Sequence, residues 1–282
     1  MADNSDQLTR FLLGAAHTRG AIIRGSSIVQ EAAQAHGLTG VPAKMFGKNL
    51  LASILLLSSS KGGVRQVLQL DAIPSQSHAP IQRMLAEASP GAVRGYLNWI
   101  EDGIASHRHS NEAGISAWMG RPIHISTVRD LGMGQPYVST IQHDSEYLAD
   151  HIVHYLNQSV QVQADVVLLG DLAILLEAMP GCDDDHWFQA VEALAAISND
   201  TLSHSSIDDI LKAFDKLECK VVGHDTYAYR CNCSIEKMTS VIESLDDEQL
   251  QDLADENGEV TVTCQYCSNH YSINLHANPS KA

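Results

Sequence analysis

The stretch that decides the architecture is the sequence CNC at residues 231–233, followed thirty residues later by CQYC at residues 264–267. Four of the six cysteines lie in these two pairs. A Cys-x-x-Cys pair is the usual way to place two thiolates on one tetrahedral metal ion, and a Cys-x-Cys pair does the same with a tighter bend. Two other interpretations explain the pattern less well. Unrelated buried cysteines would have no reason to lie in two close pairs along the sequence, and a redox-active dithiol of the thioredoxin type would need only one such pair. The spacing therefore predicts one Zn²⁺ per chain, bound by Cys231, Cys233, Cys264 and Cys267.

The residues around both pairs resemble a known family. The segments YRCNCSIEK at 229–237 and GEVTVTCQYCSNHY at 258–271 are similar to the two zinc half-sites of the redox-regulated heat-shock holdases, the thirty-three-kilodalton chaperones. Lys237 stands where many members carry Arg, which keeps the positive charge. The resemblance is specific over this C-terminal part and looser upstream. It implies a chaperone that is activated by oxidation, and not an enzyme.

Composition narrows the class of protein. The 282 residues allow one large or two smaller domains, and 34 acidic residues against 18 basic ones give a net charge of −16. Such a charge argues against binding to nucleic acid, which depends on neutralising phosphates. The most apolar run, residues 50–57, is too short to span a membrane, and the acidic start is no secretory signal. We expect a cytoplasmic protein, where clustered cysteines indicate metal or redox chemistry.

Other motifs are weaker. The chain has no Gly-x-Ser-x-Gly sequence and no P-loop, and four cysteine ligands would leave no open metal position for water, so we predict no enzyme. The GMG sequence at 132–134 is interpreted as a turn, not a nucleotide site. His151 and His154 share a helix face, but a solvated polar face is favoured over a metal site. Two alternatives to a chaperone stay open: a constitutive structural zinc protein and a zinc module that binds nucleic acid.

Residues 1–178 mix helices and strands without strict βαβ alternation. This predicts an α+β domain with a mixed sheet and packed helices, and the family resemblance implies that it is the chaperone core. Helices are predicted over 28–36, 42–59, 145–157 with Ser145 as its cap, and 171–178. Strands are predicted at 21–24, 64–70, 92–99, 122–125, 137–141 and 161–169.

A break follows at residues 179–185, where proline, glycine and three acids mark a domain boundary. Two short amphipathic helices come next, the second capped by Ser206. Helices of this length are marginal alone, which predicts a metastable helical linker over residues 179–228. A helical hairpin docked permanently on the first domain is the alternative, and the family resemblance favours the linker. Cys182 and Cys219, which flank the helices, are predicted to be inert thiols.

Residues 229–282 are predicted to form a small zinc domain. Ser234 is expected to cap one helix, and Asp246 or Asp247 to start another. Asn257-Gly258 predicts a hairpin turn, with strands around Val260–Val262 and in the 271–275 region. Apolar side chains are few here, so the metal is expected to hold the domain together.

The paired thiolates predict a switch. Oxidation should form Cys231–Cys233 and Cys264–Cys267 disulfides, because each tethered partner resolves its neighbour, and disulfide sulfur no longer holds zinc. The domain should then unfold and release the linker helices. The partners we expect are unfolded or partly folded proteins, and the oxidised protein is expected to be a homodimer. The predicted client-binding residues are Trp187, Val191, Leu194, Phe214 and Leu217.

Overall fold

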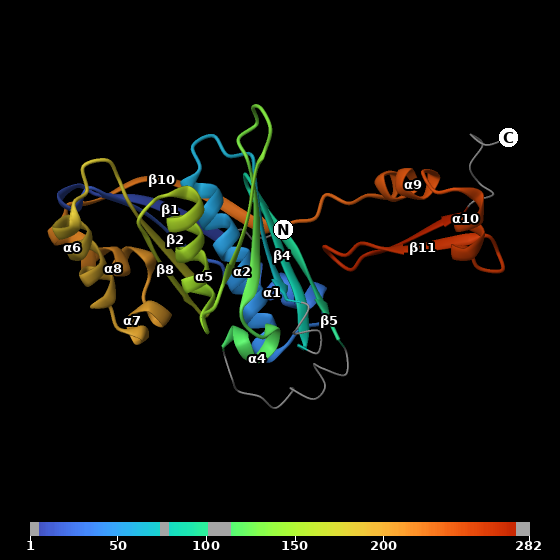
Figure 1. The fold of residues 1–282 in the computed structure, drawn as a ribbon, viewed down its shortest axis with the longest axis horizontal. Coiled ribbons are helices and arrows are strands. Elements are labelled where there is room, and N and C mark those ends of the chain that lie inside the picture. Colours follow the sequence, from blue (N-terminus) through green and yellow to red (C-terminus); the bar gives the residue numbers. More distant parts are fainter. Residues whose placement is uncertain (1–5, 74–78, 101–113, 275–282) are drawn as a thin grey trace. The chain divides into compact units, whose positions relative to one another are not determined.

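The structure is a computed structural model that describes residues 6–73, 79–100 and 114–274 (Figure 1). Backbone contacts divide the chain into two compact units, Met1–Tyr229 and Arg230–Ala282. The segment predicted as a linker, 179–228, lies within the first unit in this structure. Because its helices are folded and packed here, their predicted release on oxidation stays a prediction.

The first unit is built on one ten-stranded mixed sheet with the order β7-β6-β3-β4-β5-β10-β1-β2-β9-β8. Neighbouring strands are antiparallel except for β10 and β5, which are parallel. The predicted α+β fold is therefore confirmed. The strands are β1 (Asp6–Leu13), β2 (Thr18–Arg24), β3 (Arg65–Ala72), β4 (Ile81–Ser89), β5 (Ala92–Trp99), β6 (Ile123–Asp130), β7 (Tyr137–His143), β8 (Ala164–Leu169), β9 (Leu172–Ala178) and β10 (Cys219–Tyr229).

One face of this sheet is covered by α1 (Ser26–Ala35), α2 (Gly40–Ser59), α4 (Ile115–Met119) and α5 (Leu148–Tyr155), which a π-helical turn at Leu156–Val160 extends. The long helix α2 is buried nearly all round and contacts β2, β3, β4, β5 and β9. A helix that is apolar on every side belongs in a core. Gly95 on β5 allows the close approach, since a Cβ there would lie 2.9 Å from the Phe46 ring and 3.0 Å from Leu50.

The opposite face of β1, β2 and β9 is covered by the helices that the sequence placed in the linker. These are α6 (Asp184–Ala195), α7 (Asn199–His204), α8 (Ile207–Leu211) and the 3-10 helix η4 (Lys212–Leu217). Ser206 caps α8 as predicted, by accepting a hydrogen bond from the Asp209 amide. The Phe214 ring stacks on Phe11 of β1, with centroids 5.8 Å apart, and Gly20 of β2 leaves room for Phe11. The two surfaces form a separate apolar core.

Arg24 at the end of β2 ties α7 to the sheet. Its guanidinium donates to the carbonyls of Leu202, Ser203 and Ser205 at distances of 2.7, 3.2 and 3.1 Å, and it pairs with Asp171 at 3.1 Å. A cation is favourable at a helix C-terminus, where carbonyl groups lack partners within the helix. The helices are thus held by polar contacts as well as by apolar packing.

One predicted helix in the first unit is wrong. Residues 171–178 were expected to be helical, but Leu172–Ala178 form strand β9, between β2 and β8. Six of its seven residues are buried. A short run that is apolar throughout lacks the alternation of a half-buried strand, so periodicity cannot distinguish it from a helix. Strands β1, β4 and β10 were not individually assigned from sequence.

The start of α5 is also different from the prediction. The helix begins at Leu148 rather than at Ser145, and Tyr147 is its N-cap residue. The Ser145 hydroxyl accepts a hydrogen bond from the Tyr147 amide and donates to Asp150, so it forms a local turn before the helix. Serine side chains stabilise both kinds of structure, and the sequence does not distinguish them.

The second unit contains α9 (Ile235–Glu243), α10 (Asp247–Leu253) and the hairpin of β11 (Glu259–Thr263) and β12 (His270–Asn274). Ser234 and Asp246 are the helix caps, as predicted. The position predicted for the hairpin turn is wrong. Asn257-Gly258 lies between α10 and β11, and the two strands of the hairpin are connected by residues 264–269. Within the described residues, the buried core of this unit is small, comprising Ile242, Leu250, Val260 and Ile273.

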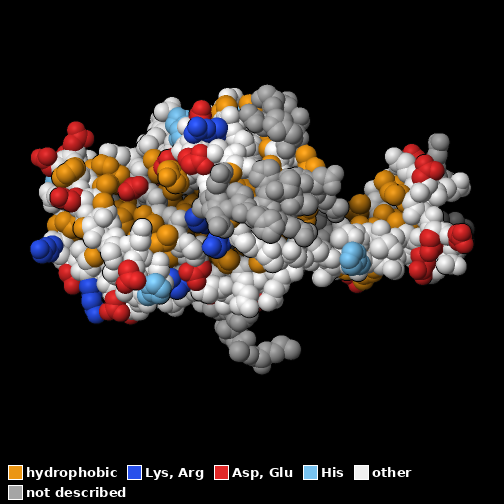
Figure 2. Space-filling model, turned by 90° about the horizontal axis from the view of Figure 1, so that it is seen from below, with side chains coloured by type: hydrophobic (Ala, Val, Ile, Leu, Met, Phe, Trp, Pro, Cys, Tyr) orange, Lys and Arg blue, Asp and Glu red, His pale blue; other side chains and the backbone are white. Residues whose placement is uncertain are grey.

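Over the described part of the chain, every helix is too short or too polar to cross a membrane. At the end of the first unit that carries α6, α7 and α8, Figure 2 shows apolar and acidic side chains interspersed on the surface. Phe188 of α6 is 65% exposed. Sequence reasoning did not single it out.

We expect Phe214→Ala to release the helices from the sheet. The ring is fully buried, and truncating a buried Phe costs about 3–5 kcal/mol because a cavity remains. Limited proteolysis of the reduced protein should then cut within residues 184–217 much faster than in the wild type. Phe188→Ala is the matched control, because an exposed ring contributes less than about 0.5 kcal/mol. Equal proteolysis of both variants would contradict the packing described here.

Candidate metal centre

The first cysteine pair lies in the loop between β10 and α9. Cys231 lies two residues after the end of β10, and Cys233 precedes Ser234, the N-cap of α9. The Ser234 hydroxyl accepts a hydrogen bond from the Lys237 amide. The Lys237 ammonium donates a hydrogen bond to the Asn232 carbonyl, in the middle of the loop. The helix start therefore fixes the bend that turns two alternate cysteines to the same side.

The second pair lies in the loop of the β11–β12 hairpin. The Cys264 amide donates to the Asn269 carbonyl at 2.9 Å, and the Ser268 amide donates back to the Cys264 carbonyl at 2.8 Å. Ser268 has a positive φ of 57°, which closes the turn. This tight loop directs Cys264 and Cys267 toward one point.

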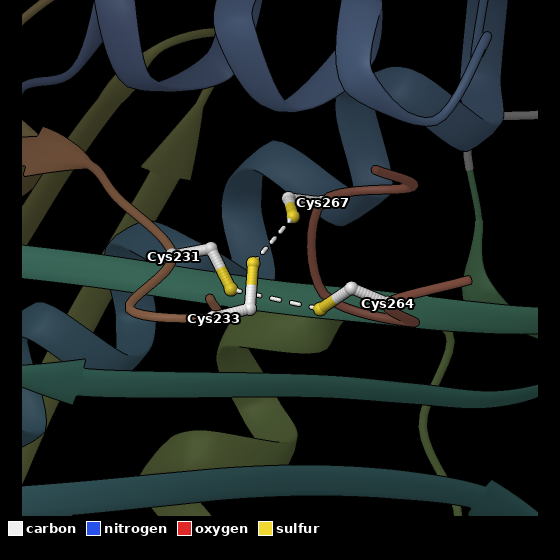
Figure 3. A group of neighbouring side chains, drawn as sticks. All are labelled: Cys231, Cys233, Cys264 and Cys267. Atoms are coloured by element: carbon white, nitrogen blue, oxygen red, sulfur yellow. Dashed lines mark hydrogen bonds between the residues drawn. The ribbon is translucent and has the colours of Figure 1, made fainter. Parts of the chain in front are cut away.

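All four sulfur atoms lie within 4.8 Å of one another (Figure 3). The Sγ atoms of Cys231 and Cys264 are 3.7 Å apart, and those of Cys233 and Cys267 are 3.3 Å apart. Four sulfurs at about 2.3 Å from one tetrahedral ion would be about 3.8 Å from each other. The predicted set of residues is brought together from two loops, and no other group of metal-binding side chains comes as close within the described residues.

The thiols differ in how easily they ionise. Burial raises the pKa of Cys233, but hydrogen bonds from the Tyr271 hydroxyl, at 3.0 Å, and from the neighbouring thiols lower it to about 7. Burial and hydrogen bonding to the other thiols raise the pKa of Cys267 instead. Neighbouring thiolates repel one another, so four anions cannot share this volume without a cation.

The residues present fit a bound metal ion. Cys264 is buried, the other three sulfur-bearing side chains are half-buried, and none is joined in a disulfide. When bound, a divalent ion would supply the positive charge that keeps all four sulfurs as thiolates. With four protein ligands the site leaves no open coordination position, which is typical of a structural metal.

The two remaining cysteines lie in the first unit. The Cys182 sulfur is 3.9 Å from the Thr18 hydroxyl, and burial, followed by the nearby Asp215 charge, raises the pKa of Cys219. A raised pKa disfavours the reactive thiolate. This agrees with the prediction that Cys219 is unreactive.

The predicted client-binding residues are not gathered on an open surface in this structure. Leu194, Phe214 and Leu217 are buried against β1, β2 and β9, and Trp187 packs at the side of the same core. Val191 is half-buried. Their role in client binding stays a prediction, and it requires the helices to leave the sheet.

In the structure, a third histidine, His143, lies beside His151 and His154. His143 of β7 stacks on His154, with ring centroids 4.1 Å apart, and its Nδ1 lies 3.1 Å from Nδ1 of His151. Burial, followed by the neighbouring His143, lowers the pKa of His151 to about 4. The trio is thus a packed cluster between α5 and β7. Sequence reasoning favoured a solvated face over a metal site, and the solvated face is wrong for His151, which is fully buried.

Fold and site together define a protein with an α+β unit and a small unit organised around four thiols. The family model described as Hsp33 protein matches residues 6–274. The chain therefore belongs to the Hsp33 family. The predicted resemblance to the thirty-three-kilodalton chaperones is confirmed.

Several relatives support this assignment. A 33 kDa chaperonin from Desulfotalea psychrophila is 29% identical, and the match covers 95% of this chain and 94% of that protein. A 33 kDa chaperonin from Trichodesmium erythraeum is 28% identical over 95% of this chain and 90% of that protein. The crystal structure of a 33 kDa chaperonin from Thermotoga maritima superposes with a TM-score of 0.78 at 20% identity, covering 96% and 95% of the two chains. This structure shows the same fold.

We expect removal of the metal with a chelator to unfold residues 230–274 and to leave the first unit folded. The reason is the small core of the second unit, compared with the extensive core around α2. Hydrogen exchange should show loss of protection for the amides of β11 and β12 and unchanged protection for β3 and β4. Protected β11 amides after complete metal removal would contradict this expectation.

Proposed function

We propose that this chain is a redox-regulated holdase that binds one Zn²⁺ when reduced and captures unfolding proteins when oxidised. The observation that carries the proposal is the cluster of four sulfurs in a unit with only a small apolar core. Four thiolates favour Zn²⁺ among the abundant divalent ions. The relatives named as chaperonins support a chaperone activity. A reducing compartment, the cytoplasm, is the setting in which such thiols stay ligated.

The chemistry of the switch uses two disulfides. Each disulfide forms from two thiolates, which lose two electrons to an oxidant of the peroxide class, and the peroxide takes up two protons to give two water molecules. All four sulfurs lie close enough for a disulfide after small movements. Neighbours within a half-site share one short loop, so Cys231 should bond to Cys233 and Cys264 to Cys267. Disulfide sulfurs carry no anionic charge to hold the cation.

Loss of the metal should reach the first unit through the chain itself. Strand β10 connects η4 to Cys231, so it is the covalent link between the docked helices and the thiol cluster. Eight residues of β10 between Cys219 and Tyr227 pair with β1, whereas only Ala228 and Tyr229, at its C-terminal end, pair with β5. We propose that unfolding of the second unit frees the end of β10 and weakens the docking of α6 to η4.

Release of the helices would uncover two apolar surfaces at once. One is the helix face with Leu194, Phe214 and Leu217, and the other is the sheet face with Phe11 and Ile22. Unfolded clients would bind such surfaces through apolar contact rather than through sequence-specific groups. The high negative charge would keep the complexes soluble. A homodimer of the oxidised form remains part of this proposal.

The alternatives receive less support. A zinc module that binds nucleic acid would need a basic surface, but residues 230–282 carry nine acidic and three basic residues. A constitutive structural zinc protein would keep its metal in peroxide. Release of zinc on oxidation therefore distinguishes the holdase from this second alternative.

We expect mild peroxide to pair Cys231 with Cys233 and Cys264 with Cys267, with loss of the bound zinc. Peptide mapping identifies the bonds, and a colorimetric chelator measures the zinc. The double variant Cys182→Ser, Cys219→Ser is the matched control and should oxidise in the same way. Disulfides that mainly join the two half-sites would contradict the assigned pairing.

The activity itself should depend on oxidation. The oxidised, zinc-free protein should suppress light scattering by a heat-denatured client at roughly stoichiometric amounts, whereas the reduced, zinc-bound protein should suppress it weakly, because the apolar surfaces are covered. Cys264→Ser is expected to be active without oxidant, since three ligands hold the metal less well. Equal protection by the reduced and oxidised wild type would overturn the proposed switch.

A further inference from the structure

Strand β7 is the last strand at one end of the large sheet, and among the described strands it pairs with β6 alone. Across the described residues, no backbone group outside the sheet forms a hydrogen bond with residues 137–143. Alternate N–H and C=O groups of an edge strand point away from the sheet, and they pair readily with another extended chain. The β6–β7 hairpin, green in Figure 1, extends beyond the body of the first unit at the top of the view.

The β7 edge lacks the features that usually protect an edge strand. Its sequence, YVSTIQH, has no Lys, Arg, Asp, Glu or Pro. Natural edges are blocked by such residues, by bulges or by short length, yet β7 keeps an unbroken register with β6 over seven residues. Tyr137 and Val138 are 62% and 71% exposed. The edge is therefore regular, uncharged and partly apolar.

The helices leave much of this strand open. Helix α5 and its π-helical turn contact β7 through the pairs His143–His151 and Ser139–Ser159, whose β7 members are half-buried. Val138, Thr140 and Gln142 point to the other face and are exposed. The opposite edge strand, β8, differs because it contacts both α5 and α7 and carries an acidic residue.

We propose that the β7 edge binds an extended apolar segment of an unfolded polypeptide as an added strand. Only an unfolded chain presents a free extended backbone, and main-chain pairing gives affinity without sequence specificity. Exposed Met133, Tyr137 and Val138 would contact its apolar side chains. The charges at the two ends of the edge are balanced: Asp144 pairs with Arg121 at 3.6 Å, and the Arg129 guanidinium, next to Asp130, lies 5.3 Å from the centre of the Tyr137 ring. A second copy of this chain fits less well, because each copy carries a charge of −16.

This site is separate from the surface that oxidation is proposed to uncover. In the sheet order, five strands lie between β7 and β1, where the docked helices begin to cover the opposite face. The edge is open while the helices are docked. It should therefore bind segments in the reduced protein as well, which goes beyond the redox-regulated activity.

The test uses the full-length, reduced, zinc-bound protein and a short fluorescent peptide with an alternating Val-Thr core and lysines at both ends. A peptide with prolines in the core is the control ligand. Thr140→Lys places a charge on the edge strand, and Ser126→Lys is its matched control on β6. Both changes remove the same hydrogen bond, because the two hydroxyls are 3.0 Å apart on the same face of the sheet.

We expect the bound peptide to slow hydrogen exchange of residues 137–143. Thr140→Lys should raise the dissociation constant of the peptide about ten-fold, the equivalent of one or two lost hydrogen bonds. Ser126→Lys should change this dissociation constant by less than about two-fold.

Several outcomes would overturn the proposal. Equal weakening by both variants would indicate binding to the sheet face. Absence of binding, equal binding of the proline peptide or unprotected β7 amides would also reject it. A dimer with protected β7 amides in the absence of peptide would assign the edge to a second copy. The test uses the reduced protein, so a negative result would not contradict the proposed activation by oxidation. Likewise, a protein that is not activated by oxidation could still bind peptides at the β7 edge.

Discussion

The crowding of four thiols is the constraint on which the stability of the second unit depends. The sulfurs lie within 4.8 Å of one another, in a unit whose described buried core has four residues. Four thiolates this close repel strongly, and so little apolar burial cannot offset the repulsion and the chain entropy. A bound cation would remove the repulsion and join the two loops. A bound metal ion would therefore make the stability of the second unit depend on these four thiolates.

The first unit has a different balance of forces. Helix α2 is enclosed by the sheet, and its core does not involve the cysteines. The helices from α6 to η4 form a smaller core on the opposite face, where Phe214 packs on Phe11 and Arg24 binds three carbonyls of the α7 end. Short helices are marginal alone, so this contact with the sheet accounts for their order. The two cores, on opposite faces of the sheet, are therefore separate.

The metal centre was the part most accessible from sequence. Ligands in two short loops are encoded locally, since the spacing of each pair and the caps at Ser234 and Asp246 are properties of a few neighbouring residues. The hydrogen bond from Tyr271 to Cys233 was not predicted, because it depends on the register of β12. The approach of His143 to His151 was missed for the same reason: the two residues belong to different elements that only the sheet brings together.

The sequence by itself determined the α+β class, the two cysteine pairs, the family and the amphipathic character of the helices after residue 183. These properties follow from composition, spacing and local periodicity. Only the tertiary structure decided that Leu172–Ala178 is a strand, that β10 lies between β5 and β1, and that Leu194 and Phe214 face a sheet. A uniformly apolar segment satisfies a helix or a strand equally well in isolation. Its conformation is set by which backbone and which apolar surface lie beside it after folding.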